Sequence, residues 1–105
     1  PVAEIGAGIM ARSQYAMLQL DAIQGVKAPI FQSPHFKEFG VNFDGTGKSV
    51  AELNQALLDR GIFGGLDLSA RFPKLGQSAL YCVTEVHPQA DIDALANALR
   101  EVVES

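Results

Sequence analysis

GIFGGLDLSARFPKLGQSALYCVTE, the segment Gly61–Glu85, decides the fold of this 105-residue chain. It contains two strand-like runs, Ile62–Leu68 and Ala79–Thr84, separated by a connection that holds Pro73 and Gly76. An uninterrupted apolar run rich in aromatic and β-branched residues is typical of a strand that is buried on both faces. The second run has this character, because four of its six residues are large and apolar: Leu80, Tyr81, Cys82 and Val83.

Four residues of this segment are candidates for contact with another chain. Gly64 and Gly65 interrupt the first run, and a glycine inside a strand pattern marks a bulge or a close approach of another backbone. Backbone geometry explains the pair fully, yet two glycines also admit a neighbouring chain or a cofactor, and the sequence leaves both readings open. Thr84 and Glu85 place a charge at a strand exit, where interfaces form, although a solvated charge is the simpler reading. We predict Gly64, Gly65, Thr84 and Glu85 as interface contacts.

The chain before this segment predicts a helix, a loop, a strand and a second helix. Apolar spacing indicates a helix over Glu4–Gln24 that Gly25 ends, with an inner face of Ile5, Ile9, Ala16, Leu20 and Ile23, widened by Met17 and Leu18. A loop with Pro29 and Pro34 follows. Glu38–Phe43 alternates between apolar and polar residues, which predicts a strand with one buried face: Phe39, Val41 and Phe43. Ser49 and Glu52 form a capping box for a helix that buries Val50, Leu53 and Leu57 and ends at Gly61.

The last element is a helix that begins near Pro88 and buries Ile92, Leu95, Ala96, Leu99 and Val102 or Val103. The element order is therefore α-β-α-β-β-α in a single small domain, residues 1–105. A strand–helix–strand unit prefers parallel strands, and the third strand then lies between them, antiparallel to both. We expect an α/β (α+β) fold with a three-stranded mixed or antiparallel sheet and helices on one face. If the third strand is apolar on both sides, its second face needs a partner that the chain does not contain.

Composition excludes several classes of protein. The chain is 48% hydrophobic and 19% charged, as in ordinary globular domains. Its net charge of −4, with no run of Lys or Arg, argues against a nucleic-acid binder. Its one cysteine fits a reducing compartment, and it has neither a secretory signal nor an apolar run of the roughly 20 residues that a membrane helix needs. We expect a cytoplasmic location, and the missing initiator Met suggests a piece of something longer.

The candidate binding and catalytic motifs are better explained by structural roles than by catalysis. Gly45–Ser49 resembles the end of a phosphate-binding loop, but the full signature needs a glycine where Asn42 stands, so a plain loop with a helix cap is expected. The two histidines, His35 and His87, lie beside prolines without the spacing of a metal site. Cys82 is expected to be a packed thiol rather than a nucleophile, because it lies in a strand predicted to be buried.

Asp91 and Asp93 near a helix start complement the helix dipole, which is a simpler role than a catalytic carboxylate pair. The residues alone therefore indicate a soluble α/β domain without a visible catalytic constellation.

Five motifs in order carry a resemblance to a known family: EFGVNF at 38–43, GIFGGLDL at 61–68, PKL at 73–75, CVTE at 82–85 and DIDAL at 91–95. Together they resemble the C-terminal part of glycine dehydrogenase (decarboxylating) subunit 1, the P-protein of the glycine cleavage system. The resemblance implies the small domain of an aspartate-aminotransferase-type (fold type I) pyridoxal-phosphate enzyme. It implies an oxidoreductase complex, aminomethyl-transferring and decarboxylating.

The same resemblance limits the expected role of this chain. In the two-subunit enzyme the lysine that holds pyridoxal phosphate belongs to subunit 2. The substrate-binding Arg of the wider aminotransferase pattern falls at Leu80 by spacing, and Arg71 lies in the connection instead. No catalytic, cofactor-binding or metal residue is therefore carried over to this chain, and pyridoxal phosphate is expected in the parent complex only.

The resemblance implies a structural and subunit-contact role in a fragment that is inactive alone. Its implied partners are the remainder of subunit 1, subunit 2 and the lipoyl carrier protein, with neither nucleic acid nor membrane among them. The alternative is a free-standing interaction or ligand-sensing module with a ferredoxin-like half-fold.

Overall fold

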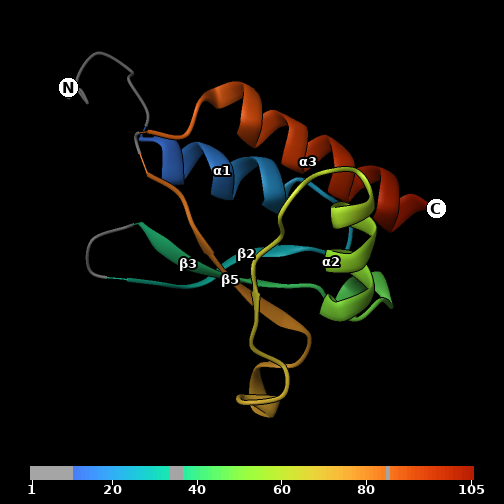
Figure 1. Cartoon of the computed structure of the whole chain (residues 1–105). Helices are drawn as coiled ribbons and strands as arrows, with labels where there is room; N and C mark the ends of the chain where they lie inside the picture. Colours follow the sequence, from blue (N-terminus) through green and yellow to red (C-terminus); the bar gives the residue numbers. More distant parts are fainter. Residues whose placement is uncertain (1–10, 34–36, 85) are drawn as a thin grey trace.

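The computed structural model describes residues 11–33, 37–84 and 86–105. The helices are α1 (Arg12–Asp21), α2 (Val50–Asp59) and α3 (Gln89–Glu104). The strands are β2 (Lys27–Gln32), β3 (Glu38–Asn42), β4 (Leu66–Asp67) and β5 (Ser78–Cys82), and two short 3-10 turns, η2 (Asp44–Thr46) and η3 (Pro73–Leu75), lie in the connections. The helices cover one side of the sheet, with α1 and α3 side by side above it in Figure 1.

The sheet has the strand order β2-β3-β5-β4, and every neighbouring pair is antiparallel. The prediction that the last strand lies between the other two, antiparallel to both, is therefore confirmed. The predicted α/β fold class with helices on one face is confirmed as well. The sheet nevertheless has four strands where three were expected, because β2 was not predicted.

Strand β2 occupies the segment that was expected to be a loop. Its register against β3 shifts between Lys27 and Phe31, around Pro29. Proline cannot donate to a strand ladder and is therefore confined to edges and bulges. Strand β2 lies at the edge of the sheet and has an irregular register, so it can contain Pro29. The proline that predicted a loop therefore lies in an irregular edge strand.

Helix α1 is shorter than the predicted helix over Glu4–Gln24. It ends at Asp21, and the part before residue 11 lies outside the described residues. Ala16, Met17 and Leu20 are buried as predicted, whereas Leu18 is 56% exposed and does not widen the inner face.

The core forms between the helices and one face of the sheet. Register pairs Phe39 with Tyr81 and Val41 with Ala79, so these four side chains share a face, and all four are buried. The Phe39 and Tyr81 rings stack with centroids 6.1 Å apart. The predicted inner faces of α2 and α3 join the same cluster: Val50, Leu53, Leu57, Ile92, Ala96, Leu99 and Val102, with Leu95 and Val103 packed against it.

The second face of the sheet lacks such a cover. On β5, Leu80 is half-buried and Cys82 is exposed, whereas Ala79 and Tyr81 are buried. The prediction that this strand is buried on both faces is therefore wrong within this chain. The packed thiol predicted for Cys82 is wrong for the same reason, because its side chain lies on the uncovered side.

The predicted capping box of α2, Ser49 with Glu52, is confirmed. The Glu52 backbone N–H donates to Ser49 Oγ at 3.1 Å, and the Ser49 N–H donates to Glu52 Oε1 at 2.9 Å. Gly61, with φ +76°, follows the end of α2. Helix α3 begins one residue after Pro88, which stands at the N-cap position without a side-chain cap.

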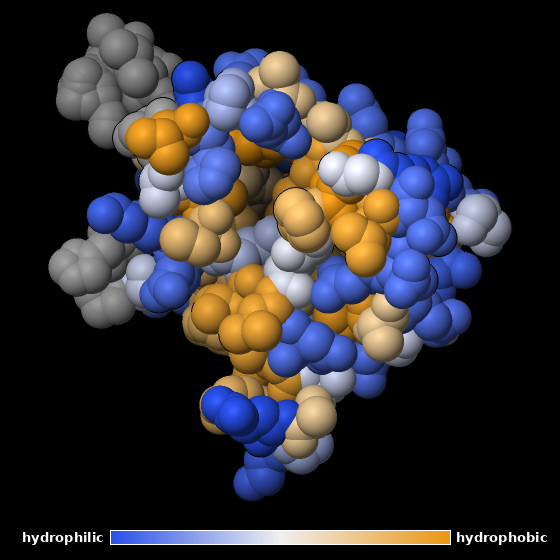
Figure 2. Space-filling model, in the orientation of Figure 1, coloured by the Kyte–Doolittle hydropathy of each residue, from blue (hydrophilic) through white to orange (hydrophobic). Residues whose placement is uncertain are grey.

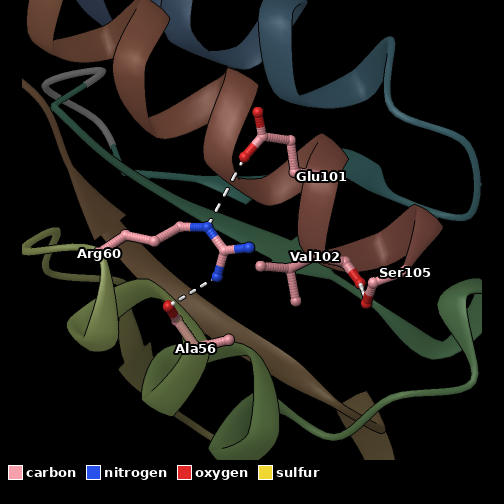
Figure 3. A network of polar contacts seen from close by, with 5 residues as sticks. All are labelled: Ala56, Arg60, Glu101, Val102 and Ser105. Carbon is pink, nitrogen blue, oxygen red and sulfur yellow. Dashed lines mark hydrogen bonds and ion pairs between the residues drawn. The ribbon is translucent and has the colours of Figure 1, made fainter.

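Helices α2 and α3 are also joined at the surface. Arg60 Nη1 donates to the carbonyl oxygen of Ala56 at 3.1 Å, and Arg60 Nε lies 3.6 Å from Glu101 Oε1 (Figure 3). The Arg60 side chain is 41% exposed and that of Glu101 70%, so this pair contributes about 0–1 kcal/mol. Within the described part of the chain, none of the helices is long and apolar enough to cross a membrane.

Candidate functional site

A groove of about 610 Å³ lies where the segment after α2, the end of β5 and the first half of α3 meet. Figure 2 shows a hollow in the face toward the viewer, with hydrophobic side chains gathered at its rim. The lining consists of residues 61–65 and 80–83 together with His87, Asp91, Ile92, Ala94 and Leu95. Two of the four predicted contact residues, Gly64 and Gly65, therefore lie in its wall.

The two glycines are required by close packing inside this chain. A Cβ on Gly65 would lie 2.6 Å from the Tyr81 ring and 2.8 Å from the Leu80 carbonyl oxygen. A Cβ on Gly64 would collide with Asn54 Oδ1. Asn54 Nδ2 also donates to the Gly65 carbonyl oxygen at 2.8 Å, which ties this wall of the groove to α2. The close neighbours of both glycines thus come from α2 and β5.

Tyr81 forms a buried part of the groove wall and is only 6% exposed. Burial raises the pKa of its hydroxyl to about 12, and a backbone hydrogen bond with Gly65 acts in the opposite direction. The phenol is therefore protonated at neutral pH and cannot serve as a base. The signal that could have found it is the central place of Tyr81 in the apolar run of β5, beside the segment that holds Gly65.

The turn between β5 and α3 holds Thr84 beside the groove. The Thr84 backbone N–H donates to His87 Nδ1 at 2.9 Å, so the hydrogen of a neutral imidazole resides on Nε2. Arg12 Nε donates to the His87 carbonyl oxygen at 3.1 Å and links this turn to α1. The structure therefore places His87 in the groove lining with the two glycines, and Thr84 is hydrogen-bonded to His87. Glu85, the fourth predicted contact, lies outside the described residues, as does His35.

The two carboxylates near the start of α3, Asp91 and Asp93, have different surroundings. Asp91 lies in the first turn of the helix and lines the groove, as a charge that complements the helix dipole. Asp93 accepts a hydrogen bond from the Tyr15 hydroxyl of α1, and this bond is the main reason why the pKa of Tyr15 is raised. The two carboxylates are therefore not gathered into an acid–base pair.

The phosphate-loop candidate Gly45–Ser49 is a turn with a helix cap, as expected. The N–H groups that would hold a phosphate already have partners, since the Val50 N–H donates to Gln77 Oε1 at 3.0 Å and the Glu52 N–H to Ser49 Oγ. A carboxylate, Asp44, also occupies the loop. The Gln77 N–H donates to Asp44 Oδ1 at 2.9 Å, and this bond is the main reason why the pKa of Asp44 is lowered.

The groove does not suit pyridoxal phosphate as a complete site. That cofactor needs a lysine amine for its aldehyde and donors for its phosphate. The lining contains neither lysine nor arginine. Nor do the residues that the structure describes include a cluster of three or more side chains able to hold a metal ion. The arrangement offers a largely apolar surface with a polar turn at its edge.

Comparison with known proteins gives a consistent result. No protein-family model matches the chain. It is 42% identical over 95 residues to a protein of Staphylothermus marinus named "Probable glycine dehydrogenase (decarboxylating) subunit 1", a match that covers 90% of this chain and 20% of that protein. A protein of the same name from Thiobacillus denitrificans is 40% identical over 105 residues, which covers 97% of this chain and 22% of the relative. The chain thus spans about a fifth of the length of the curated relatives it matches.

A solved structure is similar to this domain. It is described as "Crystal structure of glycine decarboxylase (P-protein) of the glycine cleavage system, in inhibitor-bound form". The TM-score is 0.69 at 30% sequence identity, and the match covers 86% of this chain and 19% of the other. The resemblance that the five sequence motifs suggested is confirmed by both comparisons.

Proposed function

From the premise that nearly all of this chain is homologous to about one-fifth of glycine dehydrogenase (decarboxylating) subunit 1, we propose that it is a small non-catalytic domain of such a subunit. In this role it supplies shape and subunit contact around a reaction site held by other parts of the enzyme. Its neighbours are then the remainder of subunit 1 and subunit 2, with the lipoyl carrier protein as a partner of the whole complex. We place that complex in the cytoplasm, where an exposed thiol such as Cys82 stays reduced.

The observation that carries this proposal is the asymmetry of the sequence match. The match takes up 90% and 97% of this chain but only 20% and 22% of the two relatives. A stretch of that length with its own core is what a domain of a larger subunit provides. The position of this domain at the C-terminal end of the subunit is part of the proposal.

The chemistry of the groove supports a non-catalytic contact role for this chain. Pyridoxal phosphate in the parent complex supplies the electron sink for decarboxylation of glycine. The groove presents His87 and Asp91 as its only ionisable lining residues besides Cys82 and Tyr81. The lining offers neither a lysine for the cofactor aldehyde nor an arginine for its phosphate. We therefore assign contact to this chain and the reaction to its partners.

The proposal is tested with a hybrid subunit, defined as the Thiobacillus denitrificans relative in which the matched segment is replaced by this chain. We expect the hybrid subunit to fold and to co-elute with subunit 2 in size-exclusion chromatography. A control in which the relative's own segment is excised and rebuilt at the same junctions sets the reference. A folded hybrid subunit that fails to bind subunit 2, beside a control that binds it, contradicts the proposal.

The isolated chain provides the complementary test. Pyridoxal phosphate is titrated into it, and visible absorbance is followed before and after borohydride treatment. We expect no saturable band. A band that disappears when a lysine is substituted shows that the chain holds the cofactor itself, and saturable binding of another small ligand supports a free-standing module instead.

A further inference from the structure

The uncovered face of the sheet carries an apolar row that crosses all four strands. Register places Phe31 opposite Gly40, Gly40 opposite Leu80, and Leu80 opposite Leu66. Residues directly opposite each other in antiparallel strands point to the same face. These four positions therefore form one transverse row, which we call the open-face row, on the side away from the buried pair Phe39 and Tyr81.

The open-face row is unusual for a face in contact with water. An antiparallel sheet with one solvated side carries polar residues on that side. Here Phe31 is 40% exposed and Leu66 is 65% exposed, while Leu80 is half-buried. The Phe31 ring lies over Gly40, where a Cβ would come within 2.3 Å of Phe31 Cε2. The row is thus a flat strip of aromatic and aliphatic surface.

Polar residues of β3 lie on both sides of the row: Glu38, opposite Cys82, and Asn42, opposite the buried Ser78. An apolar strip with a polar border is the pattern of a contact surface rather than of a misplaced core.

The row continues into the groove. Leu80 belongs to both, and its strand neighbour Cys82 lines the groove as well. Phe63, in the segment before the two glycines, is 84% exposed at the rim. Figure 2 shows the hydrophobic side chains that surround the hollow.

We propose that the open-face row and the groove rim at Phe63 are covered by the remainder of the longer subunit, as an interface between domains of one polypeptide. This inference rests on the proposed function. It deepens that function by naming the surface and its occupant. The helical side of the domain then faces away from this interface.

The size of the surface favours an occupant in the same polypeptide over a second copy of this chain. The exposed parts of these side chains amount to a few hundred Å², whereas a stable interface between separate proteins buries about 800 Å² on each partner. A covalently attached domain works at an effective concentration of about millimolar, so a smaller patch is enough to hold it. The matched relatives are about five times as long as this chain, so they contain the chain length that such a cover needs.

The chain carries its own probe for this surface, because Cys82 is the only cysteine in the sequence and lies in β5 beside Leu80. Thiol alkylation is measured by peptide-resolved mass spectrometry in the isolated chain and in the hybrid subunit. Accessible thiols react faster than covered ones, so we expect Cys82 to react at least about tenfold more slowly in the hybrid subunit. Equal rates in the two proteins overturn the inference.

A matched probe on the helical side controls for general effects. In a Cys82→Ser background, Ala51→Cys places a thiol at an exposed position of α2. We expect this thiol to react equally fast in both proteins. Protection at position 51 together with free reaction of Cys82 shows that the helical side is the interface. If Cys82 of the isolated chain becomes more protected as the protein concentration rises, a second copy of the chain is the occupant. This result and protection at position 51 each overturn the inference.

A second variant tests the surface without cysteine chemistry. Leu66→Lys is expected to leave the melting temperature of the isolated chain unchanged within error and to lower that of the hybrid subunit. Equal effects in both proteins overturn the inference. A hybrid subunit that does not bind subunit 2 defeats the proposed function, whereas one that binds it with Cys82 still reactive defeats this inference alone.

Discussion

At the scale of single residues, the two consecutive glycines of the groove differ in what surrounds them. Next to Gly65 are the buried Tyr81 ring and the backbone oxygen of Leu80, which cannot move aside. Next to Gly64 is mainly the end of the Asn54 side chain, which can rotate at the loss of its hydrogen bond. The same substitution therefore has two different expected costs.

We predict that Gly65→Ala lowers the free energy of unfolding by about 2–3 kcal/mol, because overpacking a rigid site costs about 1–3 kcal/mol. Gly64→Ala should cost less and serves as the matched control. Urea unfolding followed by circular dichroism measures both. A Gly64→Ala variant that is the less stable of the two contradicts this description of the groove wall.

Tyr81 makes stability depend on alkaline pH. Its pKa is about 12 in the folded chain against 10.0 for the free group, so the folded state holds the proton more tightly. The stabilisation is complete below pH 10 and is lost as pH rises towards 12, by an amount on the order of 2 kcal/mol. We predict that the wild-type chain loses more stability than Tyr81→Phe over this interval in urea titrations.

Tyr15 also has a raised pKa, because its hydroxyl is hydrogen-bonded to Asp93. The Tyr15→Phe variant controls for the contribution of this second tyrosine to the alkaline loss of stability. If Tyr81→Phe shows the same alkaline loss as the wild type, burial of the Tyr81 hydroxyl is not what couples stability to pH.

At the scale of elements, local signals were accurate where they depend on neighbouring residues. The capping box at Ser49, the strand at Glu38–Asn42 and the inner face of α3 all follow from short-range patterns, and the structure contains each of them. Strand β2 could not be predicted in this way, because an edge strand with Pro29 is stabilised by its neighbour β3 and not by its own sequence. Tertiary pairing overrode the local signal.

The same limit applies to the groove. The sequence drew attention to Gly64, Gly65 and Thr84, but it could not supply Asn54 or Tyr81, which reach the glycines from α2 and β5. The apolar run in β5 was correctly identified as the centre of the sheet. Its second face was predicted to be buried, and within this chain that face is open.

The capping box yields an element-scale prediction. Ser49→Ala removes the acceptor for the Glu52 N–H and should cost about 1 kcal/mol in urea unfolding. The Ser49 backbone N–H, which this substitution leaves in place, holds the pKa of Glu52 below its ordinary value, so the Glu52 half of the box stays formed at neutral pH in the variant. Ser49→Thr, which keeps a hydroxyl at the cap position, is the control. A Ser49→Thr variant that loses as much stability as Ser49→Ala contradicts the assignment of the cap.

At the scale of the whole molecule, one core joins all three helices to the sheet, so the domain should unfold as a unit. Leu99 is fully buried in it, whereas Leu18 is 56% exposed on α1. We predict that Leu99→Ala costs about 2–5 kcal/mol and that Leu18→Ala costs well below 1 kcal/mol. Thermal unfolding by calorimetry distinguishes them, and similar losses from both variants contradict the assignment of the core.

The most direct measurement for the account as a whole is glycine-dependent release of carbon dioxide. It compares the isolated chain supplied with pyridoxal phosphate with the hybrid subunit combined with subunit 2, the cofactor and the lipoyl carrier protein. We predict no release above background from the isolated chain and restored release from the hybrid subunit, at a level set by the rebuilt control. Release of carbon dioxide from glycine by the isolated chain would contradict the account, because the chain would then carry a reaction site of its own.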